Sequence, residues 1–226
     1  MVDAQARPLP IRAVLFDLDG TLVDSAPDLA AALNRLRADQ GLAALPLAHL
    51  RPYVSQGARG MLSAGMNITE AQSDYAAMRD AFLAHYERDV CRDSIPFDGI
   101  GEVLEAIAAR GLRWGVVTNK ARRFTEPLLA ALDLWRRAAC VVCGDSTAKS
   151  KPHPEPLLFA ARALALPPAQ CVYVGDAARD IEAAQAAGML SLVAEYGYIP
   201  AHERPRDWPA TGWLVAPKDL LEWLPT

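Results

Sequence analysis

The sequence has few cysteines, and they are too scattered to form a disulfide framework. Its 226 residues include four, namely Cys91, Cys140, Cys143 and Cys171. Cys140 and Cys143 make one C-x-x-C pair, but no second pair and no histidine follows at the spacing of a zinc site. We therefore interpret both as residues of a buried strand rather than as metal or redox ligands.

Long apolar runs and an excess of basic charge are also missing. No apolar stretch approaches the roughly 20 residues of a membrane helix, and residues 1–10 lack the apolar region of a secretory signal. The chain carries 23 basic and 27 acidic residues, so it offers no electrostatic footprint for a nucleic acid. These absences predict a cytoplasmic protein that binds neither a membrane nor a nucleic acid.

What the sequence does have is the composition of a folded globular protein. Hydrophobic residues make up 52% and charged residues 22% of the chain, which excludes disorder as the working state. Short apolar runs recur between amphipathic helical stretches, which is typical of parallel strands buried on both faces. This rhythm predicts a doubly wound three-layer α/β fold with a parallel sheet. The expected strands are Arg12 to Phe16, Arg113 to Val117, Cys140 to Cys143, Cys171 to Val174 and Leu190 to Ala194.

The distance between the first two expected strands indicates an inserted domain. Nearly a hundred residues separate them, far more than one crossover needs, and alanine-rich helical patterns cover Asp28 to Ala38 and Glu70 to Glu87. The chain length also favours one core domain plus an insert. We expect a small helical cap domain at residues 24–95 and a core domain made of residues 1–23 and 96–226.

Two carboxylates follow the first expected strand at alternate positions, Asp17 and Asp19. They lie at the carboxyl edge of a buried strand, where α/β proteins bind ligands. Two such groups repel each other and are costly to desolvate, so their placement indicates a bound cation or a role in proton transfer. The alternative is an acidic turn that caps the following helix.

Three further segments place polar residues at the ends of later strands. They contain Thr118 and Asn119, then Lys151, and then Asp176 and Asp180. Each has a structural alternative when it is taken alone: Thr118 and Asp176 as helix caps, and Lys151 as a solvated loop residue. If all of these structural alternatives were correct, independent caps and loop residues would have to gather by coincidence at one edge of one sheet. A functional site explains their common position better.

The four segments resemble, in order, the signatures of the haloacid dehalogenase superfamily of aspartate-nucleophile phosphatases. The matching segments are Asp17-Leu18-Asp19-Gly20-Thr21, Val116 to Lys120, Ser150 to Pro154 and Val174 to Asp180. Within the superfamily the chain resembles the phosphoglycolate phosphatase group and, more closely, the related N-acetylmuramic acid 6-phosphate phosphatases. The segments with that similarity are Trp114 to Lys120, Arg123-Phe124, Glu126-Pro127, Ser150 to Leu157 and Tyr196 to Ile199.

The resemblance implies a catalytic role for each acid. Asp17 would attack phosphorus and form an aspartyl-phosphate, and Asp19 would act as general acid and then general base. Mg²⁺ would be held by the Asp17 side chain, the Asp19 main-chain carbonyl and Asp176, with Asp180 in support. Many relatives have a second acid where this chain has Ala177, which argues against extra metal ligands but leaves the pattern of Asp176 and Asp180 intact.

The resemblance also implies which residues contact the substrate. Thr118 and Lys151 would be catalytic residues that hold the transferring phosphoryl group, and Asn119 is grouped with them as substrate-binding. Within the expected cap, Arg59 lies between two glycines, where it suits a substrate anion close to the backbone.

The sequence therefore predicts a magnesium-dependent phosphomonoester hydrolase that acts on a small phosphorylated metabolite. 2-Phosphoglycolate and N-acetylmuramate 6-phosphate are the leading substrates, and we expect a monomer or a homodimer. A phosphosugar mutase would keep the same aspartyl-phosphate and return it to a sugar hydroxyl, so it stays an open alternative. A phospho-receiver signalling domain also uses an aspartate, a lysine and a threonine, but it has no need of an insert after its first strand.

Overall fold

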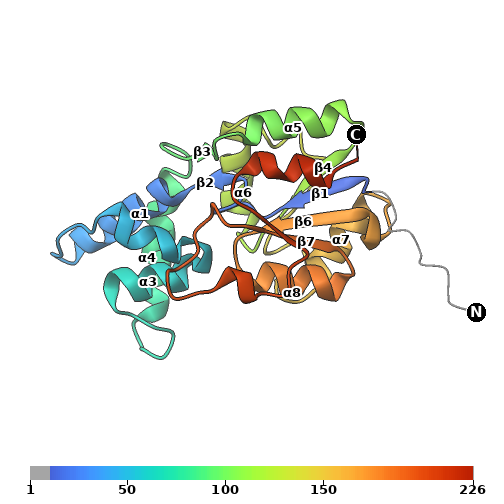
Figure 1. The fold of residues 1–226 in the computed structure, drawn as a ribbon. Helices are drawn as coiled ribbons and strands as arrows, with labels where there is room; N and C mark the ends of the chain where they lie inside the picture. Colours follow the sequence, from blue (N-terminus) through green and yellow to red (C-terminus); the bar gives the residue numbers. More distant parts are fainter. Residues whose placement is uncertain (1–10, 226) are drawn as a thin grey trace, which may run out of the picture.

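The computed structural model describes residues 11–225 and is built around a six-stranded sheet (Figure 1). All neighbouring strands are parallel, in the order β5-β4-β1-β6-β7-β8. This order brings β1 to the middle of the sheet, between β4 and β6. The strands are β1 (Ala13–Phe16), β4 (Arg113–Val117), β5 (Cys140–Val142), β6 (Cys171–Gly175), β7 (Leu190–Ala194) and β8 (Gly212–Leu214).

Helices cover both faces of the sheet, because successive side chains of a strand point to opposite faces. Val14 and Phe16 of β1 join one apolar cluster, whereas Ala13 and Leu15 join a second cluster on the other face. The first face is covered by α5, α6 and η4, and the second by α7 and α8. The architecture confirms the predicted doubly wound three-layer fold. These helices are α5 (Ile100–Ala109), α6 (Arg122–Ala131), α7 (Glu155–Ala163), α8 (Ala178–Ala187) and η4 (Pro217–Trp223).

A group of helices extends from one end of the sheet, on the left in Figure 1. The chain enters this region through β2 (Val23–Asp24) and leaves it through β3 (Ile95–Pro96), which pair as antiparallel strands. Entry and exit are therefore neighbours. The helices are α1 (Ala26–Asp39), α2 (Leu47–Leu50), η1 (Arg51–Gln56), α3 (Gly57–Met66) and α4 (Tyr75–Arg88).

The bounds of the elements differ from the sequence-based expectation by a few residues. Helix α4 begins at Tyr75 rather than near Glu70, because the preceding residues form turns in which the Thr69 N–H donates to Gln72 Oε1 at 2.6 Å. Strand β6 extends through Gly175, one residue further than expected. Two short 3₁₀ helices, η2 (Pro168–Gln170) and η3 (Pro205–Asp207), complete the described elements.

The four cysteines are free thiols in the structure. Within residues 11–225, no helix combines the length and the apolar character that a membrane crossing requires.

Candidate active site

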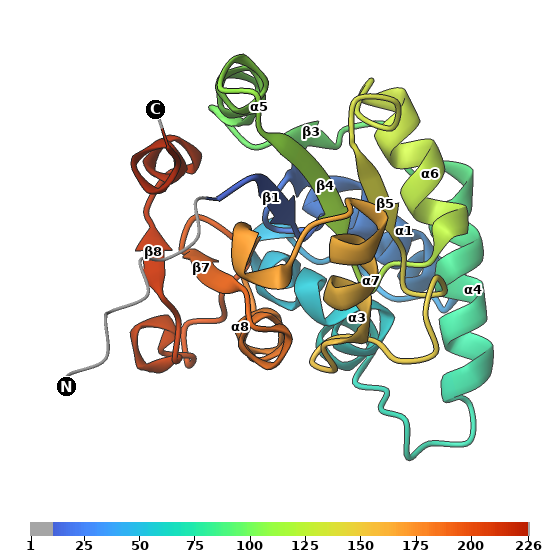
Figure 2. The same ribbon diagram turned by 90° about the vertical axis from the view of Figure 1, so that its right-hand side faces the viewer.

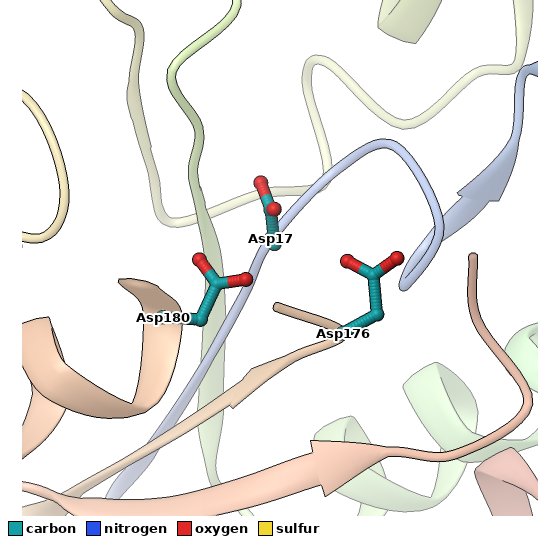
Figure 3. A group of neighbouring side chains, drawn as sticks. All are labelled: Asp17, Asp176 and Asp180. Carbon is teal, nitrogen blue, oxygen red and sulfur yellow. The ribbon is translucent and has the colours of Figure 1, made fainter. Parts of the chain in front are cut away.

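Three buried carboxylates converge at the carboxyl edge of the sheet (Figure 3). Asp17 follows β1, Asp176 follows β6, and Asp180 lies in the first turn of α8. One carboxylate oxygen from each side chain lies within 4.8 Å of the other two. All three residues are at most 3% exposed.

The pairing of two parallel strands explains why these acids meet. Phe16 of β1 is in register with Val174 of β6, and the Asp17 N–H donates to the Val174 carbonyl at 2.8 Å. Gly175 then allows the close approach of α8, because a Cβ at this position would lie 2.5 Å from the Cβ of Asp180. The register of β1 with β6 therefore places Asp176 beside Asp17, and Gly175 allows Asp180 to approach the same point.

The buried ammonium group of Lys151 connects two of the three acids. Its Nζ lies 2.9 Å from Asp17 Oδ1 and 2.8 Å from Asp180 Oδ1, and the side chain is fully buried. Lys151 Nζ also donates to the hydroxyl of Tyr173 at 2.7 Å, and that hydroxyl donates to the Val117 carbonyl at 2.7 Å. A buried charge needs such partners, so Lys151 has one fixed position.

The site holds more negative charge than Lys151 offsets. Burial raises the pKa of Asp17, although the Lys151 ammonium acts in the opposite direction. Burial, together with the charges of Asp17 and Asp180, raises the pKa of Asp176 to about 7. The Arg179 guanidinium also interacts with all three acids, so three carboxylates face two cations, and a bound cation would offset the one negative charge that is left.

Asp180 has partners for both of its carboxylate oxygens. Oδ1 faces Lys151, and Oδ2 accepts the N–H of Ala177 at 3.0 Å. Helix α8 begins at Ala178, so the Ala177 N–H lies at the start of the helix. Asp180 therefore caps this helix, a role that the sequence suggested for Asp176. The geometry gives Asp180 a clear role in holding Lys151.

Asp176 is bound by residues from distant parts of the chain. Its Oδ2 accepts the Ser55 hydroxyl at 2.6 Å and the Tyr198 N–H at 2.9 Å, whereas Oδ1 has only a long contact of 3.5 Å with the Thr21 hydroxyl. Ser55 belongs to η1, in the helical insert, and its carbonyl accepts a hydrogen bond from Arg179 at 2.6 Å. Ser55 thus joins the insert to the core at the site itself.

Asp19 lies apart from the three buried acids and is partly exposed. Its Oδ1 accepts the Ser25 hydroxyl at 2.5 Å. Lys120 Nζ donates to both carboxylate oxygens, at 2.9 and 3.1 Å.

Thr118 and Asn119 follow β4, and Asn119 faces the loop that contains Lys151. The Thr118 N–H donates to the Val142 carbonyl at 2.9 Å, and its side-chain oxygen accepts the N–H of Lys120 at 3.1 Å. The Asn119 side chain makes two hydrogen bonds with the backbone of Lys151. Its Nδ2 donates to the Lys151 carbonyl and its Oδ1 accepts the Lys151 N–H, each at 3.0 Å. Asn119, expected as a substrate-binding residue, therefore holds Lys151 in place through its side chain.

A cavity of about 880 Å³ opens above these residues and separates the core from the insert. Asp17, Asp19, Thr118 and Lys151 line its core side. Arg59 of α3 is exposed and lines the insert side. The remaining lining includes an apolar group formed by Leu29, Val54, Phe82, Leu83 and Phe124.

The sequence analysis did not identify several residues that build the site. Tyr173 could have been found, because it is the only hydroxyl-bearing residue in the apolar run Cys171–Gly175. Ser55 and Tyr198 follow no periodic pattern, and only the fold brings them to Asp176. Arg179 and Lys120 stand inside the quoted motifs, but spacing alone does not show what they contact.

Comparisons with known proteins agree on one family. Residues 14–194 match the model of the haloacid dehalogenase-like hydrolases. The chain is 40% identical to the N-acetylmuramic acid 6-phosphate phosphatase of Pseudomonas aeruginosa, over 94% of each chain. It is 43% identical to the phosphoglycolate phosphatase of Xanthomonas campestris pv. campestris, over 93% of this chain and 95% of the relative.

A solved structure shows the same architecture. A predicted phosphoglycolate phosphatase from Haemophilus somnus superposes with a TM-score of 0.81 at 28% identity, covering 94% of this chain and 97% of that one. The family match spans most of the sheet and all four motif segments. The chain therefore belongs to the haloacid dehalogenase-like hydrolase family.

Proposed function

We propose that this protein is a magnesium-dependent phosphatase that hydrolyses a small phosphorylated metabolite through an aspartyl-phosphate. One observation carries the proposal: Asp17 is ion-paired with the buried Lys151 beside Asp176 and Asp180, at the floor of a large cavity. The family and the names of both curated relatives support this reaction class.

The proposed reaction has two displacements at phosphorus. Asp17 attacks, the bond from phosphorus to the ester oxygen breaks, and Asp19 gives a proton to the departing oxygen. Water then attacks the aspartyl-phosphate and gives a proton to Asp19, the bond to Asp17 breaks, and inorganic phosphate leaves. Lys151 and Thr118 stabilise the oxygens of the transferring group, with Lys151 as a buried point charge.

The acidic group fits a magnesium ion. Asp17, Asp176 and Asp180 offer carboxylate oxygens, which are the ligands that Mg²⁺ prefers, and burial together with the charges of the other two acids raises the pKa of Asp176. Asp17, Asp176 and the Asp19 carbonyl would hold the ion, while Asp180 supports the site from its position against Lys151. When bound, Mg²⁺ would offset the charge of the phosphoryl group.

The helical insert at residues 24–95 acts as the cap over the site in this proposal. Its η1 helix binds Asp176 through Ser55, and its helices line the cavity opposite the acids. A cap of this kind excludes bulk water and provides groups that bind the leaving group. Arg59 is our candidate ligand for a substrate anion.

The experiment that tests the proposal measures inorganic phosphate release with magnesium and with EDTA. The substrates are 2-phosphoglycolate, N-acetylmuramate 6-phosphate, glucose 6-phosphate and p-nitrophenyl phosphate. We expect release that requires magnesium and is lost in Asp17→Asn. Interconversion of sugar phosphates without phosphate release would instead establish a mutase, and the absence of both reactions would contradict the proposal.

A further inference from the structure

Lys120 is a buried lysine that the proposed chemistry does not use. It lies in the loop between β4 and α6, and its side chain is 9% exposed. Its backbone is fixed, because the Lys120 N–H donates to Thr118 Oγ1 at 3.1 Å and its carbonyl accepts the Gly144 N–H at 2.8 Å. A lysine in such a place needs compensating partners for its charge.

Two residues supply that compensation, and they come from different parts of the molecule. Among the described residues, Asp19 is the only acid within ion-pair distance of Lys120 Nζ. On the other side, Nζ lies 4.6 Å from the centroid of the Tyr86 ring, in the range of a cation–π interaction. The ammonium group is therefore held between a carboxylate of the core and an aromatic face of the insert.

Tyr86 belongs to α4 and contacts the core by packing as well as by charge. Its ring lies 5.4 Å from that of Phe124 in α6, and the residue is 1% exposed. Figure 2 shows the upper end of α4 next to α6. The Tyr86 hydroxyl is buried and has no hydrogen-bond partner within 3.5 Å in the part of the chain that the structure describes, and the ring face is the contact that the distances establish.

Asp19 is consequently held from two directions. Ser25, at the start of α1, binds Oδ1, and Lys120 binds both oxygens. A carboxylate with both oxygens bound has little freedom to rotate about its last torsion. Proton transfer requires a defined position of the carboxyl group relative to the departing oxygen.

We propose that Lys120 is the positioning residue for Asp19, and that the Tyr86 ring fixes Lys120 and so makes the orientation of Asp19 depend on α4 docking against the core. This inference rests on the proposed function, in which Asp19 exchanges protons with the leaving group and with water. Lys120 also lines the cavity, but in this inference it acts through Asp19 rather than on the reacting atoms.

The test compares leaving groups in the Lys120→Met variant. 2-Phosphoglycolate and N-acetylmuramate 6-phosphate release alkoxides that need a proton, whereas p-nitrophenyl phosphate releases a stable anion. We expect kcat/KM to fall at least about 100-fold for whichever alkyl esters the wild type hydrolyses, and about 10-fold or less for p-nitrophenyl phosphate. Lys218→Met, at an exposed lysine outside the cavity lining, is the matched control and should match the wild type.

Variants of Tyr86 separate the ring from the hydroxyl. Tyr86→Phe keeps the ring and should behave as the wild type, whereas Tyr86→Leu removes it and should show the Lys120→Met pattern with a smaller loss. Equal losses for both kinds of leaving group, or a change in KM alone, would overturn the inference, because Lys120 would then serve the fold or bind substrate directly.

A crystal structure of Lys120→Met keeps the inference testable even if the wild type hydrolyses no ester. We expect the Asp19 carboxylate to rotate or to occupy more than one orientation. An unchanged Asp19, still bound by Ser25 alone, would refute the positioning role. Failure of the proposed function appears separately, as an inactive wild-type enzyme.

Discussion

At the residue scale, the position of Lys151 connects its proposed role in catalysis with the stability of the fold. Its ammonium has no exposure to solvent and lies between Asp17 and Asp180. Breaking a buried ion pair by removing one partner is costly, because the other charge stays buried without compensation. A solvated loop lysine, the structural alternative suggested by the sequence, would have no such effect.

We expect Lys151→Met to abolish phosphate release and to lower the free energy of unfolding by about 3–5 kcal/mol. Both effects have one cause, since Asp17 and Asp180 lose their shared cation. Denaturant unfolding of the variant and the wild type measures the second effect. A variant that unfolds at the wild-type denaturant concentration would show that the two ion pairs do not stabilise the fold.

Asp176 gives the metal-free protein a defined response to pH. Its pKa is about 7 in the folded chain and near its ordinary value of 3.8 when unfolded. Between these values the folded state holds a proton that the unfolded state has lost, so stability decreases as pH rises through this range and levels off above about 7. Magnesium requires the ionised carboxylate, so its stabilising effect grows over the same range.

Thermal unfolding between about pH 5 and about pH 8, in EDTA or in magnesium, measures this response. At about 100 times its Kd, magnesium adds about 2.7 kcal/mol, which corresponds to roughly 5–10 °C in Tm for a chain of this size. Asp176→Asn should lose most of the magnesium effect and be more stable than the wild type in EDTA at high pH. If magnesium still stabilised the Asp176→Asn variant as much as the wild type, Asp176 would not be a ligand of the ion.

At the scale of elements, glycines permit the loops to close around the acids. The Gly197 segment follows β7, and a Cβ at Gly197 would lie 2.3 Å from the Gly20 carbonyl oxygen and 2.4 Å from the Cβ of Asp176. Neither neighbour is the free end of a flexible side chain. This segment also donates the Tyr198 N–H to Asp176, so its path determines how that acid is held.

We expect Gly197→Ala to destabilise the protein by about 1–3 kcal/mol and to weaken magnesium binding, because overpacking displaces the loop that holds Asp176. Gly101→Ala is the matched control. Gly101 lies in α5 with nothing within 4 Å of its added Cβ, so the substitution should be neutral or slightly stabilising. Magnesium titrations followed by thermal unfolding compare the two, and a Gly197→Ala protein with wild-type affinity would contradict the argument.

The elements also show what could be predicted from sequence and what could not. The apolar runs predicted the five strands that surround the site, and strand ends placed Asp17 and Asp176 at one edge, because parallel strands share a carboxyl edge. Lys151 was expected at a strand end as well, but it lies in the loop between β5 and α7, and its ion pairs with Asp17 and Asp180 bring it to that edge. The start of α4 was expected too early, since an alanine-rich pattern does not reveal a turn. The partners Ser55 and Tyr198 depend on how the insert and the last loops dock, and that information lies in tertiary packing.

At the scale of the whole molecule, the insert and the core meet at the acids and again beside Asp19. Ser55 of η1 binds Asp176, and Tyr86 of α4 covers Lys120. The cavity lies between these two contacts, so any ligand that fills it touches both parts. The distance between the first two strands predicted an insert, but the contacts of Ser55 and Tyr86 with the core are visible only in the folded chain.

Binding at this cavity should therefore slow local opening of the insert as well as of the core loops, because a ligand that bridges two parts stabilises their closed arrangement. We expect magnesium with beryllium trifluoride, a mimic of the phosphoryl group, to slow amide hydrogen exchange in η1 and in the half of α4 that contains Tyr86. Exchange in α5 and η4, which cover the sheet outside the cavity lining, serves as the internal control and should not change. Protection confined to the loops after β1, β4 and β6 would show that the insert does not close on the phosphoryl group, and the dependence of Asp19 on α4 would then lose its physical basis.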